Sequence, residues 1–186
     1  GELINQVTDG DWEVTNYYGF DEDSKTIFYQ SVENGSINRD VYSVKLNGKN
    51  KKRLTKRDGT NSASFSADFT YFINTHSSAT SPQEYTLNDS KSGKLIKSIK
   101  DNDRLAQKVA DYVTSKKEFS TISVNGNELN MWMIKPADFD PNKKYPLFMY
   151  QYSGPGSQQV ANRWNGANDY WYQHLAQEGY IVACVD

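Results

Sequence analysis

The residues best placed to do chemistry follow a short apolar run in the last quarter of the chain. The run at 145–150 gives way to Gln-Tyr-Ser-Gly-Pro-Gly at 151–156, and polar residues come next. This pattern is typical of a strand that ends in a tight loop, in which Pro155 restricts the backbone. A phenol held in such a loop can donate a hydrogen bond to an oxygen atom on which negative charge develops during a reaction. We therefore predict that Tyr152 is one donor of an oxyanion hole.

The sequence does not supply a nucleophile to go with this donor. The strained turn that presents a catalytic serine reads Gly-x-Ser-x-Gly, and no serine of the chain stands in that pattern. Ser157 has Pro155 and Gln159 at the two positions that require glycine. In the α/β-hydrolase class the acid and the histidine follow the nucleophile along the chain. We therefore expect the catalytic Ser, Asp and His beyond Asp186, and we predict that the chain alone is inactive.

The first hundred residues contain an internal repeat with a period of about 45 residues. The segment 20–23 aligns with 65–68, and the segment 41–44 aligns with 84–87. Each repeat holds four short runs rich in β-branched and aromatic residues, separated by turn residues such as Asn47-Gly48. Four-stranded units at this spacing are typical of β-propeller blades. The expected strands are 12–18, 26–31, 40–46 and 52–54 in the first repeat, and 62–65, 70–75, 83–88 and 95–99 in the second.

The pattern changes after Asn102. Apolar residues at helical spacing predict a helix over 103–113, which we interpret as part of a linker. From Glu118 the strand pattern returns, with strands at 118–124 and 129–135 around a hairpin turn at Asn125-Gly126. A nearly continuous apolar strand at 145–150, a helix at 170–177 ending near Gly179, and a buried strand at 180–185 complete the chain.

This order of elements predicts a mixed β and α/β fold. We expect residues 1–102 to form the C-terminal blades of a β-propeller, about two four-stranded blades in number, which need further blades to close a ring. Residues 103–117 are the expected helical linker. Residues 118–186 are expected to be the N-terminal part of an α/β-hydrolase sheet, because that sheet opens with an antiparallel hairpin followed by strand, helix and strand.

Composition excludes several classes of partner. The 21 basic and 23 acidic residues give a net charge of −2, so we expect no binding to nucleic acid. No apolar stretch is long enough to span a membrane, and no residue set at ligand spacing suggests a metal or another cofactor. The single cysteine, Cys184, lies in an apolar run and is predicted to be a buried strand residue.

The chain resembles the dipeptidyl peptidase IV branch of the prolyl oligopeptidase family of serine peptidases. The resemblance runs over essentially the whole chain and is carried by Gly-Asp-Trp-Glu-Val at 10–14, Lys-Lys-Tyr-Pro at 143–146, the loop at 151–158 and the strand at 181–186. It implies a propeller placed before an α/β-hydrolase domain, with peptides as substrates. It also implies that Tyr152 forms one half of the oxyanion hole, the other half being the backbone N–H after the nucleophilic serine.

The resemblance implies a serine exopeptidase that acts near the N-terminus of peptides, often after proline, through an acyl-enzyme. A pair of glutamates that recognises the substrate amine in this branch is not found here, so a sister branch, such as an acylaminoacyl or prolyl tripeptidyl peptidase, stays open. A non-catalytic peptide-binding propeller module is the alternative from another class. A homodimer of the parent protein and a place in the bacterial periplasm or cell envelope are both compatible with the sequence, which determines neither.

Overall fold

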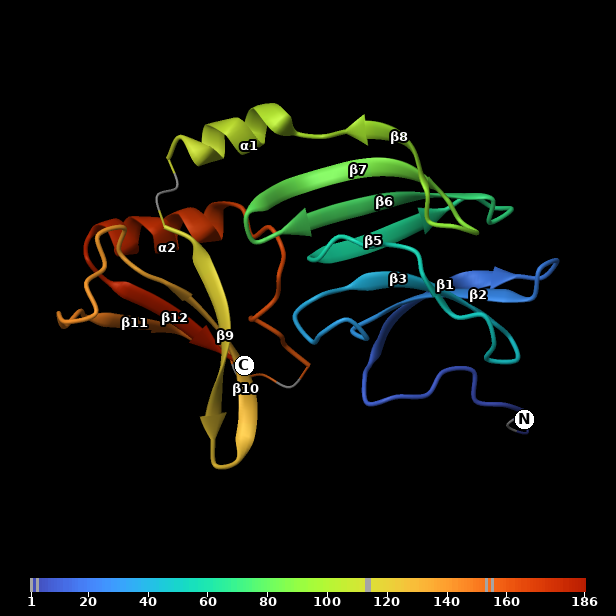
Figure 1. Ribbon diagram of the computed structural model, residues 1–186, viewed down its shortest axis with the longest axis horizontal. Coiled ribbons are helices and arrows are strands. Elements are labelled where there is room, and N and C mark those ends of the chain that lie inside the picture. Colours follow the sequence, from blue (N-terminus) through green and yellow to red (C-terminus); the bar gives the residue numbers. More distant parts are fainter. Residues whose placement is uncertain (1, 3, 113–114, 153, 155) are drawn as a thin grey trace. The chain divides into compact units, whose positions relative to one another are not determined.

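The structure is a computed structural model that describes residues 2, 4–112, 115–152, 154 and 156–186 (Figure 1). The chain forms two compact units. One unit consists of Gly1–Ser78 and Gln83–Asp101, and the other of Ala79–Pro82 and Asn102–Asp186. Neither helix within the described ranges has the length and apolar character that crossing a membrane requires.

The first unit contains two four-stranded sheets, in each of which the strands lie side by side in chain order. The first sheet consists of β1 (Val14–Asp21), β2 (Thr26–Ser31), β3 (Asp40–Lys45) and β4 (Lys52–Arg53), and the second of β5 (Thr60–Phe65), β6 (Tyr71–Ser78), β7 (Ser81–Asp89) and β8 (Leu95–Lys100). The eight strands expected from the sequence are confirmed. The largest difference is that β6 and β7 continue to a two-residue turn, because backbone pairing extends through polar residues as readily as through apolar ones.

An aromatic core joins these two sheets. Phe28, Val41, Leu54 and Phe72 are buried in one cluster, and the ring of Phe65 lies 4.5 Å from that of Phe28 and 5.2 Å from that of Phe72, centroid to centroid. Burying a side chain of this size contributes about 1.5–3 kcal/mol. The repeat seen in the sequence thus supplies apolar residues to a shared interior.

The second unit is built on one mixed sheet with the strand order β11-β12-β10-β9. Its strands are β9 (Lys117–Val124), β10 (Asn127–Ile134), β11 (Leu147–Tyr150) and β12 (Ile181–Val185). β10 pairs antiparallel with both β9 and β12, whereas β11 runs parallel to β12. The predicted hairpin turn is confirmed, since Asn125 and Gly126 have φ values of 52° and 82°, as a type I′ turn requires.

Two helices accompany this sheet. α1 (Asp103–Ala110) is shorter than the predicted 103–113, and Val113 lies outside the described residues. α2 (Ala167–Gln177) begins earlier than the predicted 170–177 and connects the parallel strands β11 and β12. The ring of its Tyr172 packs 5.1 Å from that of Trp132 and 5.7 Å from that of Tyr150. The helix therefore covers the face of the sheet that these rings occupy.

The nearly continuous apolar character of the strand at 145–150 predicts a buried strand, and this prediction is wrong for its apolar residues. β11 is the edge strand of the sheet, and Leu147, Phe148 and Met149 are 57%, 37% and 48% exposed. Successive side chains of a strand point to opposite faces of the sheet, so neither face of β11 is fully covered by the described residues, and as an edge strand it has a neighbouring strand on one side only. Within the described residues this strand is therefore an apolar edge with free backbone groups.

Candidate functional site

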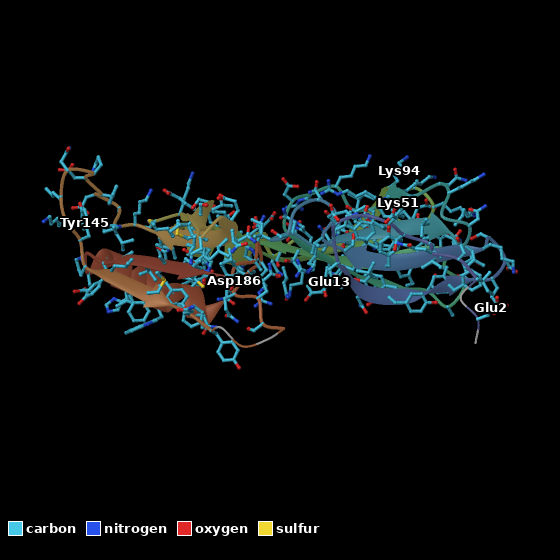
Figure 2. The ribbon with its side chains drawn as sticks, turned by 90° about the horizontal axis from the view of Figure 1, so that it is seen from below. Glu2, Glu13, Lys51, Lys94, Tyr145 and Asp186 are labelled. Atoms are coloured by element: carbon cyan, nitrogen blue, oxygen red, sulfur yellow. The ribbon has the colours of Figure 1, made fainter. Side chains whose placement is uncertain are left out.

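The candidate site lies where the parallel strands β11 and β12 end. Tyr150 pairs with Cys184 at this end of the sheet, so the loop after β11 and the residue after β12 meet at the same edge. Tyr145 and Asp186 lie at opposite ends of the sheet, and Asp186 lies at the end where β11 and β12 finish (Figure 2). Carboxyl ends of parallel strands are the usual place for ligand sites in α/β folds.

Tyr152, the residue expected from the sequence, lies in this loop two residues after β11. Its side chain is 61% exposed, so its hydroxyl is open to a ligand. Gly154 lies against it: a Cβ atom at position 154 would be 2.8 Å from Cε1 and 3.4 Å from the hydroxyl of Tyr152. The glycine thus leaves room for the tyrosine ring to lie over its own loop. Ser153 and Pro155, also named from the sequence, lie outside the described residues.

Asp186 binds the far end of the same loop, a contact that the sequence did not reveal. Its carboxylate accepts hydrogen bonds from the backbone N–H groups of Gln159 and Val160 at 2.8 Å and 2.6 Å. The side chain of Gln159 is itself bound by the hydroxyl of Tyr150 at 3.0 Å. An acidic residue directly after a buried strand was the only signal in the sequence for this role.

Cys184 lies in β12 beneath the site. It is fully buried, as predicted. Burial raises the pKa of its thiol to about 11, with a smaller contribution from the nearby Asp186. Cys184 is therefore a packed strand residue and is unsuited to act as a nucleophile at neutral pH.

We expect the thiol of Cys184 to resist alkylation in the folded chain. With the pKa at about 11, only about one thiol in a thousand is ionised at pH 8, and the thiolate is the reactive form. Mass spectrometry after incubation with iodoacetamide at pH 8 should show no adduct, whereas the same chain in urea should be labelled completely. Rapid labelling without denaturant would contradict the burial of this strand.

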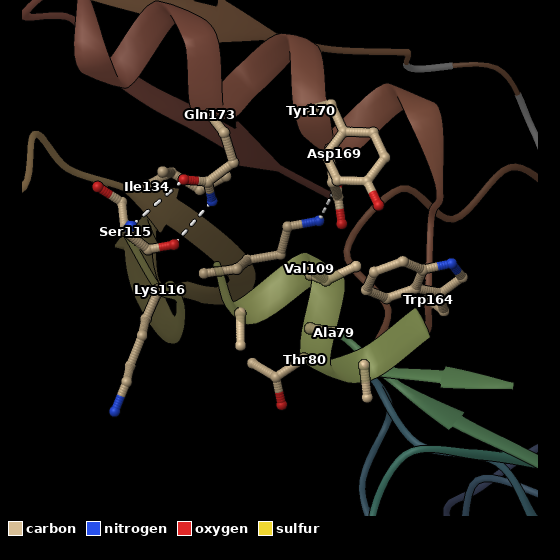
Figure 3. A pocket seen from close by; sticks show the side chains of 13 residues that line it. Ala79, Thr80, Val109, Ser115, Lys116, Ile134, Trp164, Asp169, Tyr170 and Gln173 are labelled. Atoms are coloured by element: carbon tan, nitrogen blue, oxygen red, sulfur yellow. Dashed lines mark hydrogen bonds and ion pairs between the residues drawn. The ribbon is translucent and has the colours of Figure 1, made fainter. Parts of the chain in front are cut away.

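A hollow of about 300 Å³ lies elsewhere in the second unit, between α1, α2 and the start of β9 (Figure 3). Lys117 and Asp169 form an ion pair there with an N–O distance of 2.6 Å, and Lys117 Nζ lies 4.8 Å from the ring centroid of Trp132. Gln173 exchanges two hydrogen bonds with the backbone of Ser115. These polar groups bind one another, so we interpret the hollow as a stabilising interior and Tyr152 as the centre of the candidate site.

The chain is similar to known dipeptidyl peptidases. The family profile described as "Dipeptidyl peptidase IV (DPP IV) N-terminal region" matches residues 1–83. Dipeptidyl peptidase 4 of Arthroderma otae is 37% identical over 163 residues, which are 85% of this chain and 21% of that protein. Dipeptidyl peptidase 4 of Trichophyton rubrum is 36% identical over 164 residues, or 86% of this chain and 21% of that protein.

The crystal structure of Porphyromonas gingivalis dipeptidyl peptidase 4 is also similar. The two chains are 43% identical in sequence and superpose with a TM-score of 0.92. The match covers 99% of this chain and 26% of the Porphyromonas gingivalis chain. The chain thus spans about a fifth of the length of the curated relatives it matches and about a quarter of this structure.

Proposed function

We propose, because the chain belongs to the dipeptidyl peptidase IV family, that it is part of a longer serine exopeptidase that releases dipeptides from the N-termini of peptides. The observation that carries this proposal is the place of Tyr152. It follows a strand whose carboxyl end lies beside that of a parallel neighbour, where an α/β enzyme collects its catalytic groups.

In this proposal the hydroxyl of Tyr152 donates a hydrogen bond to the oxyanion of the tetrahedral intermediate. The substrate carbonyl oxygen becomes negatively charged when the nucleophilic serine attacks, and a donor that is already in position lowers the energy of that state. The second donor would be the backbone N–H after the serine, and the serine, its histidine and its acid would lie beyond Asp186.

The two units fit different parts of such an enzyme. We propose residues 1–102 as two propeller blades, a proposal supported by two successive four-stranded sheets with strands in chain order. Residues 103–117 would be the linker, and residues 118–186 the start of the α/β-hydrolase domain. The parallel pair β11 and β12, joined through α2, supports the last assignment.

The exposed edge of β11 is consistent with a domain that continues. Leu147, Phe148 and Met149 form an apolar strand with no neighbour on its outer side among the described residues. We propose that further strands and helices of the hydrolase domain cover it in the longer protein, because an exposed apolar edge strand promotes aggregation.

The first experiment is an assay of the full-length protein with a chromogenic glycyl-prolyl anilide, and the 186-residue chain serves as the control. Release of the chromophore by the full-length protein alone is the expected result, since the nucleophile is absent from the chain. A full-length protein that cleaves only acylated or tripeptidyl substrates would assign it to a sister branch. A protein without any peptidase activity would overturn the proposal in favour of a binding module.

Replacing Gly154 with alanine should lower kcat without unfolding the protein. The new Cβ atom would lie 2.8 Å from Cε1 of Tyr152, so the ring must move, and misplacing a catalytic group by about 1 Å can cost up to about 10²-fold in rate. Steady-state kinetics and the melting temperature are the measurements. In a Tyr152→Phe background the same change should cost little, because no hydroxyl remains to be misplaced. An unchanged kcat of Gly154→Ala would contradict this packing.

A further inference from the structure

We propose that Asp186 is a positioning residue for the oxyanion hole. Its carboxylate holds the end of the loop that carries Tyr152, and through that loop it determines where the tyrosine hydroxyl lies. This inference rests on the role proposed for Tyr152. It assigns a function to a residue that has no place in the catalytic triad or in the oxyanion hole itself.

The carboxylate is well fixed by the sheet. Asp186 follows β12 directly, and its backbone N–H donates to the carbonyl oxygen of Asn130, within β10, at 3.0 Å. The side chain therefore starts from a rigid strand end. From there Oδ1 lies 2.9 Å from the backbone nitrogen of Gln159, and Oδ2 lies 2.8 Å from that nitrogen and 2.6 Å from the backbone nitrogen of Val160.

Burial makes this contact important for the loop. Val160 is fully buried, so its backbone N–H cannot turn to bulk water for an acceptor. Leaving such a donor unpaired costs about 1–3 kcal/mol, whereas a hydrogen bond to a charged acceptor contributes about 1.5–3 kcal/mol. The loop end is therefore held where the carboxylate is, and Asp186 sets its position.

A series of contacts leads from this end of the loop back to the tyrosine. The Gln159 side chain donates from Nε2 to Oγ of Ser157 at 2.8 Å, and the Ser157 N–H donates to the carbonyl oxygen of Gly154 at 3.1 Å. Gly154 in turn lies against the ring of Tyr152. The described residues of this loop, Tyr152, Gly154 and 156–160, are thus linked by these contacts and attached to the sheet at β11 and at Asp186.

Asparagine is the informative replacement because it keeps the shape of the side chain. One of its two terminal atoms is an amide nitrogen, a donor, which would face the donor of Gln159 or Val160 in place of an acceptor. The negative charge that strengthens both bonds is also lost. The loop end should shift, and the tyrosine hydroxyl should shift with it.

The test is a double-mutant cycle in the full-length protein with the glycyl-prolyl anilide as substrate. Asp186→Asn should lower kcat by about 10-fold or more while KM changes little, since misplacement of about 1 Å is costly in rate. In a Tyr152→Phe background the same substitution should have almost no effect on kcat. Asp138→Asn, which removes the same charge from an exposed loop residue of the same unit, is the matched control and should leave kcat unchanged.

The cycle separates the possible outcomes. If Asp186→Asn lowers kcat equally with and without the Tyr152 hydroxyl, Asp186 only stabilises the fold and the inference is wrong. If Asp186→Asn has no effect although Tyr152→Phe has a large one, the inference is wrong and the function of Tyr152 stands. If Tyr152→Phe itself has no effect, the proposed oxyanion role fails.

A second variant serves if Asp186→Asn does not fold. Tyr150→Phe removes the hydroxyl that binds Oε1 of Gln159 and so loosens the same loop end without changing a charge. A fall in kcat that disappears in the Tyr152→Phe background supports the inference. A kcat equal to that of the unmodified protein, or a fall that persists in that background, overturns it.

Discussion

Replacing Tyr152 with phenylalanine in the full-length protein is expected to lower kcat by about 10²- to 10³-fold, the usual cost of removing one oxyanion donor. The substitution removes a single oxygen atom from a side chain that is 61% exposed, so the fold should not change. KM should change little, because the hydrogen bond forms only when the oxyanion does.

Steady-state kinetics with the glycyl-prolyl anilide measures this effect. Tyr180→Phe is the matched control, since Tyr180 is 38% exposed and precedes β12 at the opposite end of the sheet. The control should have the kcat of the unmodified protein. If Tyr152→Phe also turns over at the unmodified rate, Tyr152 is not an oxyanion donor.

Replacing Lys117 with methionine is expected to lower the free energy of unfolding of the chain by about 3–5 kcal/mol, the usual effect of removing one partner of a buried ion pair. The side chains of Lys117 and Asp169 are only 6% and 13% exposed, so the carboxylate of Asp169 would remain in the interior without its partner. The position of Asp169 in the first turn of α2 offsets part of this cost through the helix dipole.

Urea unfolding followed by tryptophan fluorescence measures the loss. Lys116→Met is the matched control, because Lys116 is the adjacent residue and is exposed; it should change the free energy by no more than about 0.5 kcal/mol. The double variant Lys117→Met, Asp169→Leu should recover much of the stability, since both buried charges are then gone. If Lys117→Met is as stable as Lys116→Met, the ion pair is not buried in solution.

The local elements of this protein follow closely from its sequence. β2 was expected at 26–31 and forms at Thr26–Ser31, and the turn at Asn125-Gly126 is present. These elements depend on short-range preferences, namely alternation along a strand and the positive φ that Asn and Gly tolerate. The loop after β11 was likewise readable, because an apolar run followed by Gly-Pro-Gly ends a strand wherever it occurs.

The contacts that hold the site and the interior of the second unit depend on residues far apart along the chain. Asp186 meets Gln159 across 27 residues, and Lys117 meets Asp169 across 52. The exposure of the β11 side chains is also a tertiary property, since it depends on which elements pack on the two faces of the sheet and not on the strand's own apolar residues. Sequence alone determined the strands, the turns and Tyr152 as the candidate donor. Only the tertiary structure placed β11 parallel to β12, and that pairing brings Asp186 to the loop of Tyr152.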